Sequence, residues 1–325
     1  MKNTQTFNPF LFHCSKLQEL LNLASKQENS ALWLFENNAR TPLFMLEALT
    51  RIHNKTFDEK LFTKWHKRFK TLEDIFGKID YYIWLQKEFS DNKKIDKSIL
   101  DAYQKKATKL IATCNKRLQK KDWLKGKLYS FTVKLSNYDL EFNQEYIDAL
   151  KETITDEITD IIIFLEKINF TFTILEDELH DMRRKLRWLS IYGQALNGLI
   201  QLKKTTIKNK FQHKYLTKTI LNSPYNKLPA KPKNVEILEY DTDSFFAMSW
   251  VINEFGALKD EGIKLEALQN IYLKREDITA YQAKQKSSKN LNVIVNREEE
   301  ILNQASDIIK TFILKDKVLD KLLIK

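Results

Sequence analysis

The chain has 325 residues, a formal net charge of +11 and a pI near 9.3, and it contains only six glycines and five prolines. So few turn-forming residues exclude a fold built from many short strands and predict long helices, in one large domain or two of ordinary size. The positive charge favours an anionic partner, although a lysine-rich surface can also serve solubility alone.

The cysteines and the apolar runs bear on the setting of the protein. Cys14 and Cys114 are far apart and lack the spacing of a CxxC motif or a metal site, which predicts reduced thiols, no metal and no cofactor. The first nine residues lack the apolar core of a secretion signal. Apolar runs such as residues 161–165 are far shorter than the ~20 residues that cross a bilayer. We therefore expect a cytoplasmic protein without a membrane partner.

Apolar periodicity predicts five helices in the first part of the chain. They cover residues 10–26, 30–52, 58–89, 94–121 and about 144–170. We expect Pro42 to kink or restart the second helix and Gly77 to interrupt the third. Residues 130–143 alternate weakly and predict a loop or an irregular segment, with Asn137 or Asn143 as the N-cap of the fifth helix.

The second part of the chain predicts four more helices, interrupted by one basic insertion. The helices are expected at residues 175–202, 243–258, 262–289 and 296–323. Residues 201–234 hold nine lysines, three prolines and no acid, which is typical of a mobile or partly ordered insertion. This insertion fits an anion-catching arm and an ordinary surface excursion equally well.

Two further basic regions stand out. The stretch from Lys105 to Lys127 holds nine cationic residues and a single acid, Asp122, which fits a solvated face as well as a binding face. The segment 179–189 contains three of the nine arginines of the chain. On a helix, its cations project from one side, and its apolar residues form a separate stripe that can face a core. The cations are His180, Arg183, Arg184 and Arg187, and the apolar residues are Leu179, Met182, Leu186 and Leu189.

This arginine-rich segment has a partial internal copy. Residues 32–40 align without gaps on residues 179–187, so that the core-facing positions coincide and Arg40 meets Arg187. Each copy is followed by a phenylalanine–glycine pair with an aspartate shortly after it, in Ile75–Asp80 and in Asn253–Asp260. The pattern predicts a duplicated helical unit with one insertion.

The arginine-rich helix, with its histidine and the later F-G and aspartate signature, resembles the CHAD family, the conserved-histidine α-helical domain. The resemblance implies an all-α fold of two tandem antiparallel four-helix-bundle halves related by a pseudo-twofold. It places an N-terminal helical extension at residues 1–28, the first half at 29–155 and the second half at 156–325, with the lysine-rich insertion at 203–234. The first half departs from the family pattern, because Trp33 stands where the histidine is expected.

The same resemblance implies binding of inorganic polyphosphate in a basic groove, without catalysis. Arginine suits this ligand because its planar fork grips phosphate oxygens and stays charged. The implied binding residues are His180, Arg183, Arg184 and Arg187, with Arg40, Lys64, Lys67, Arg68, Lys203 and Lys204 as further cations. The expected partners are polyphosphate or another polyanion, with polyphosphate-granule proteins as further candidates.

The sequence gives less support to other functions. The chain has no HExxH, Walker-type glycine loop, GxSxG or clustered metal ligands, so no enzyme activity is predicted. The adjacent pair His13 and Cys14 would point about 100° apart on a helix and makes a poor nucleophile dyad. In an alternative interpretation of the basic helix, the histidine makes structural hydrogen bonds and the arginines pair with nearby acids. A helical scaffold that has lost its anion site and a nucleic-acid binder remain alternatives. Nucleic acid is disfavoured because Trp188 and Tyr192 point away from the cationic face.

Overall fold

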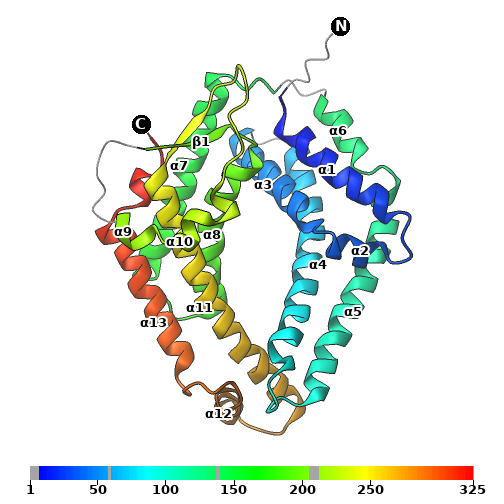
Figure 1. The fold of residues 1–325 in the computed structure, drawn as a ribbon, viewed down its shortest axis with the longest axis vertical. Helices are drawn as coiled ribbons and strands as arrows, with labels where there is room; N and C mark the ends of the chain where they lie inside the picture. The colour runs from blue at the N-terminus through cyan, green and yellow to red at the C-terminus, as the bar shows by residue number, and fades with distance from the viewer. Residues whose placement is uncertain (1–6, 58–59, 137–139, 205–211, 325) are drawn as a thin grey trace. The chain divides into compact units, whose positions relative to one another are not determined.

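The computed structural model describes residues 7–57, 60–136, 140–204 and 212–324. The protein is mainly helical, as the composition predicted, and it also contains one small sheet (Figure 1). The α-helices are α1 (Pro9–Ala24), α2 (Ser30–Glu36), α3 (Arg40–Phe57), α4 (Lys60–Ser90), α5 (Lys97–Lys120), α6 (Tyr129–Ser136), α7 (Gln144–Lys167), α8 (Asp181–Ala195), α9 (Gln212–Tyr215), α10 (Lys218–Asn222), α11 (Thr242–Arg275), α12 (Ala280–Leu291) and α13 (Arg297–Lys310). The strands are β1 (Ile200–Lys203) and β2 (Leu238–Asp241). None of the described helices is long and apolar enough to span a bilayer.

The chain divides into two compact units. Unit 1 comprises Met1–Leu150, Gln194–Leu199 and Pro232–Glu236, and unit 2 comprises Lys151–Gly193, Ile200–Lys231 and Ile237–Lys325. Unit 1 therefore holds α1 to α6 and the start of α7. Unit 2 holds the rest of α7, nearly all of α8, the sheet and the remaining helices.

Helix α4 is central to unit 1, where it packs against both α3 and α5 (Figure 1). Its apolar stripe is fully buried, and the aromatic rings of the stripe contact Phe10 of α1 and Phe131 of α6. The stripe consists of Phe62, Trp65, Phe69, Leu72 and Phe76. The predicted interruption at Gly77 is wrong, because α4 continues through it for 31 residues. One helical glycine costs only about 1 kcal/mol, which burial of this stripe outweighs.

Two other predictions in unit 1 concern helix boundaries. The predicted restart near Pro42 is confirmed, since α2 ends at Glu36 and Pro42 lies in the first turn of α3, where a missing N–H is tolerated. The predicted loop at 130–143 is wrong over its first part, which forms α6 and buries Phe131. Two turns are too short for a periodicity signal to emerge. The cap at Asn143 is confirmed, because its side-chain oxygen accepts the Tyr146 N–H at 3.0 Å; Asn137, the other candidate, lies outside the described residues.

In unit 2 the predicted break near residues 258–262 is wrong. Helix α11 runs for 34 residues through Gly256 and Gly262 and buries apolar side chains along its whole length. The chain breaks instead after Arg275, and Thr279 begins α12 with a reciprocal capping box to Gln282. Gly256 and Gly262 do not end the helix, because neither glycine is followed by a capping motif.

The helix predicted to reach residue 202 ends at Ala195, and the chain then forms β1. Strand β1 pairs in parallel with β2, in register from Ile200 with Leu238 to Lys203 with Asp241. The described part of the insertion up to Lys231 belongs to unit 2, where α9 and α10 contact α11 and where Ile220 and Asn226 are buried. Residues 205–211 of the insertion lie outside the described residues.

Candidate anion-binding site

The arginine-rich helix has the two faces that its sequence predicted. A π-helical turn at Leu175–His180 leads directly into α8. The apolar stripe is completely buried, with Leu179, Met182, Leu186 and Leu189 all at 0% exposure. On the other side Arg184 is exposed, whereas His180, Arg183 and Arg187 are half-buried. The cations therefore differ in how far each can reach a ligand.

His180 is paired within its own helix. Its Nδ1 lies 2.8 Å from Oε2 of Glu176, one turn earlier. This hydrogen bond is the main reason that the pKa of Glu176 is lowered, with smaller contributions from Lys259 and Arg184. Arg187 is also engaged by neighbouring groups. Arg184 has no carboxylate within ion-pair distance in the described part of the chain.

Arg183 packs across helix α11. Its Nε donates to the carbonyl oxygen of Ile252 at 3.1 Å, and a Cβ added to Gly256 would lie only 3.0 Å from its Nη2. Burial lowers the pKa of Arg183, and the charge of Asp260 partly opposes this shift. Gly256 is therefore needed so that the guanidinium can lie flat on the helix backbone.

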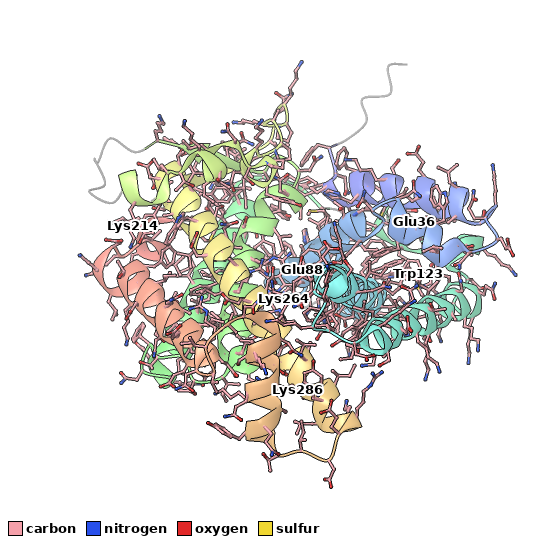
Figure 2. All side chains as sticks on the ribbon, turned by 60° about the horizontal axis from the view of Figure 1, so that its bottom comes forward. Glu36, Glu88, Trp123, Lys214, Lys264 and Lys286 are labelled. Atoms are coloured by element: carbon pink, nitrogen blue, oxygen red, sulfur yellow. The ribbon has the colours of Figure 1, made fainter. Side chains whose placement is uncertain are left out.

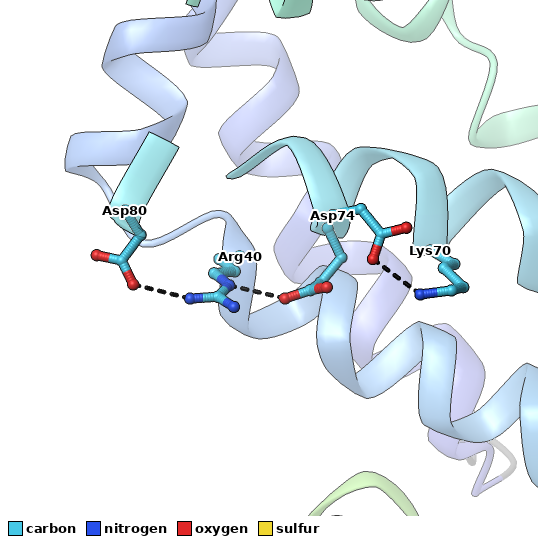
Figure 3. Close-up of polar contacts among 5 residues, drawn as sticks. Arg40, Lys70, Asp74 and Asp80 are labelled. Atoms are coloured by element: carbon cyan, nitrogen blue, oxygen red, sulfur yellow. Dashed lines mark hydrogen bonds and ion pairs between the residues drawn. The ribbon is translucent and has the colours of Figure 1, made fainter. Parts of the chain in front are cut away.

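Arg40 makes the equivalent contact in unit 1. Its Nε donates to Oε1 of Glu73 at 2.7 Å and its Nη1 to Oδ2 of Asp80 at 2.9 Å (Figure 3). A Cβ added to Gly77 would lie 2.9 Å from its Nη2. In each unit, then, an arginine lies across a glycine of a long helix, with an aspartate about one turn further on. The F-G and aspartate signature marks this packing contact.

This contact also changes the register of the internal repeat. The sequence alignment matched Arg40 with Arg187, but the residue that packs as Arg40 does is Arg183, one helical turn earlier. With this shift the buried leucines of α3 and α8 still coincide, as Leu43 with Leu186 and Leu46 with Leu189. A shift of four residues preserves the apolar face of a helix, so periodicity alone could not choose between the two registers.

The cations predicted on α4 behave differently from Arg40. Lys64 and Lys67 are exposed, and the guanidinium of Arg68 lies 4.4 Å above the ring of Trp65. None of these three pairs with a carboxylate in the described part of the chain. They follow one another at i, i+3 and i+4, so they share one face of the helix.

The two predicted cations at the start of the insertion lie in unit 2. The Nζ of Lys203 lies 2.6 Å from Oε2 of Glu239 on the neighbouring strand, and Lys204 is exposed. Lys203 is therefore neutralised across the sheet.

By sequence the basic stretch after Lys105 fits a solvated face as well as a binding face, and the structure brings the end of this stretch close to α4. Arg68 and Lys64 are near enough to Lys127 to lower its pKa, after partial burial as the largest cause. Lys121 acts on Lys127 in the same direction. The high density of cations around Trp123 is visible in the sequence and could have pointed to this cluster. The sequence does not indicate which helix these cations face.

The His13 and Cys14 pair is built into the core of unit 1. The Nε2 of His13 lies 3.0 Å from the carbonyl oxygen of Ala195, and burial lowers its pKa to about 4. Cys14 is buried, and burial raises the pKa of its thiol. Neither group is exposed for chemistry with a solute.

Comparison with known proteins gives no relative for this chain. No protein-family model matches it. No curated protein and no solved structure matches it significantly.

Proposed function

We propose that the protein binds inorganic polyphosphate or a similar polyanion, without turnover, and that its two units are tandem CHAD-like four-helix-bundle halves. Two features support this proposal. The pattern at residues 179–187 resembles the family helix, and both units hold an arginine across a helical glycine followed by an aspartate.

The observation on which the proposal depends is the set of unpaired cations on α4. Lys64, Lys67 and Arg68 occupy one helix face, and no carboxylate neutralises them in the described part of the chain. Like charges at this spacing repel and destabilise a helix by a few tenths of a kcal/mol per pair. A bound polyanion removes this repulsion and supplies the missing counter-charge.

The structure alters which of the predicted residues we assign to the ligand. Arg40 and Arg183 are held by helix-packing contacts, so we assign them a structural role. In unit 2 the cations that we assign to binding are Arg184 and Arg187, with His180 available when its bond to Glu176 opens. Each unit thus contributes its own cationic face.

A nucleic-acid ligand has less support. Single strands are held largely by stacking of bases on exposed aromatic rings between the basic residues. Tyr192, which follows the arginines on α8, is fully buried, and its hydroxyl donates to Oε1 of Glu157 at 2.9 Å. A helical scaffold that binds a protein is the other alternative, and the same experiment separates all three.

The test is titration of the protein with long-chain polyphosphate at several salt concentrations. Lys64→Gln with Lys67→Gln, and separately Arg184→Gln with Arg187→Gln, should weaken binding and reduce the slope of log K against log salt by about one to two, by analogy with phosphate neutralisation on DNA. The matched control is Lys105→Gln with Lys109→Gln, which removes two exposed charges from α5. If the control variant loses as much affinity and slope as the other two, the binding is non-specific and the proposal is wrong. If single-stranded RNA displaces polyphosphate at equal charge, the ligand is nucleic acid.

A further inference from the structure

A pocket of about 300 Å³ lies in unit 1, where α4 meets the end of α5 and the turn that follows it. It is lined by Lys67, Arg68, Thr71, Arg117, Lys121, Trp123 and Lys127. Five of these seven side chains are cationic and none is acidic. We call this the basic pocket.

The charge of the basic pocket is largely uncompensated. None of its five cations forms an ion pair with a carboxylate in the part of the chain that the structure describes. Partial burial, followed by the charge of Arg68, lowers the pKa of Lys127, and Lys64 and Lys121 add to this effect. Asp122 is the acid that opposes it. The pocket therefore holds cations that repel one another.

The backbone around the basic pocket is fixed by a tight turn. Asp122 and Gly126 adopt left-handed conformations, with φ of 56° and 89°. The N–H groups of Lys125 and Lys127 both donate to the carbonyl oxygen of Asp122 at 3.0 Å. This turn sets Lys127 beside α4 before any ligand arrives.

The apolar wall of the pocket is equally fixed. Trp123, labelled in Figure 2, is only 3% exposed, and its ring meets that of Trp65 edge-on at 6.2 Å. Its face is thus covered and cannot stack on a base. The hydroxyl of Thr71 donates to the carbonyl oxygen of Lys67 at 2.5 Å, so its proton is already used. What the pocket offers to a ligand is positive charge.

We propose that the basic pocket binds a compact oligophosphate group, such as pyrophosphate or the end of a longer phosphate chain. A volume of about 300 Å³ is large enough to take a pyrophosphate ion. Near neutral pH a terminal phosphate carries up to about two negative charges and an internal phosphate of a chain about one, so two or three linked phosphates approach the net charge of the five cations and Asp122. The inference rests on the proposed function, because Lys67 and Arg68 belong both to the α4 face and to the pocket.

The test is calorimetric titration of the full-length protein with pyrophosphate, with sulfate as a compact anion of lower charge. We expect one pyrophosphate per chain and weaker binding of sulfate. Lys121→Gln with Lys127→Gln should lower pyrophosphate affinity about a hundredfold, since each of the two charged contacts is worth about tenfold, or about 1.5 kcal/mol. Lys105→Gln with Lys109→Gln removes the same charge from the exposed face of α5 and should leave the affinity within about twofold. Circular dichroism checks that both variants keep their helical content.

Each outcome separates this inference from the proposed function. If pyrophosphate binds the two variants equally, or sulfate binds as tightly, the basic pocket is not an oligophosphate site. If long-chain polyphosphate binds while pyrophosphate does not, the inference fails and polyanion binding stands. If pyrophosphate binds in the pocket and long-chain polyphosphate does not bind the protein at all, the pocket stands and the proposed function fails. If long chains displace pyrophosphate from the parent protein, the pocket also takes part of a longer phosphate chain.

Discussion

Replacing Gly256 by alanine tests the packing of Arg183 on α11. In an unobstructed helix this change stabilises by about 0.8–1 kcal/mol, because alanine loses less backbone entropy than glycine. Here the new Cβ would lie 3.0 Å from Nη2 and 3.2 Å from Nε of Arg183, so the guanidinium must move. The movement weakens the bond from Nε to the carbonyl oxygen of Ile252, and a charged hydrogen bond is worth about 1.5–3 kcal/mol. We therefore expect Gly256→Ala to lower the free energy of unfolding by about 0.5–2 kcal/mol.

The sign of this effect should reverse when the arginine is removed. In an Arg183→Ala background the three atoms nearest to the added Cβ are gone, and Gly256→Ala should then stabilise by about 1 kcal/mol. Urea unfolding of the four proteins, followed by circular dichroism, gives the coupling energy directly. If Gly256→Ala stabilises the parent protein as much as it stabilises the Arg183→Ala protein, the glycine does not serve this contact.

Three other consequences of the structure can be measured. Burial lowers the pKa of His53 to about 4, against about 6.5 in the unfolded chain, so it should contribute roughly 3 kcal/mol of stability above pH 6.5 that is lost as pH falls toward 4. Urea midpoints of His53→Gln should therefore vary less between pH 7 and pH 4.5 than those of the parent. Arg40→Ala should cost about 2 kcal/mol, because it leaves Glu73, only 8% exposed, without its partner; a loss below 0.5 kcal/mol in denaturation would contradict this. Cys14 and Cys114 should resist a thiol reagent in the folded protein and react after denaturation, since burial raises the pKa of both thiols, that of Cys114 to about 12.

The candidate site was only partly predictable from the sequence. The spacing of the motif helix correctly gave a buried stripe opposite a cationic face. The sequence could not tell that Arg183 lies on Gly256, or that Arg40 is held by two carboxylates, because these partners are far apart along the chain. An arginine that packs against a neighbouring helix and an arginine that is free to bind a ligand can occupy the same positions in the helical pattern. Their difference lies in what the neighbouring helix presents.

The basic pocket illustrates the same limit. Its α5 residues were visible as a dense basic stretch, and its α4 residues as cations beside an apolar stripe. Joining them requires knowledge of how α4 and α5 lie side by side and of the left-handed turn at Asp122. Neither property is encoded in a local pattern of charge.

The sequence by itself determined the helical class, the buried stripe of α4 and the restart near Pro42, because turn composition and apolar periodicity are local properties of the chain. Only the tertiary structure decided that α11 continues through Gly256, since there the contact with Arg183 favours glycine and the burial along the helix outweighs its entropy cost. It also decided that residues 200–203 form a strand, because a parallel partner at residues 238–241 satisfies their backbone hydrogen bonds. In both cases the deciding energy comes from groups far away in sequence, which no local pattern contains.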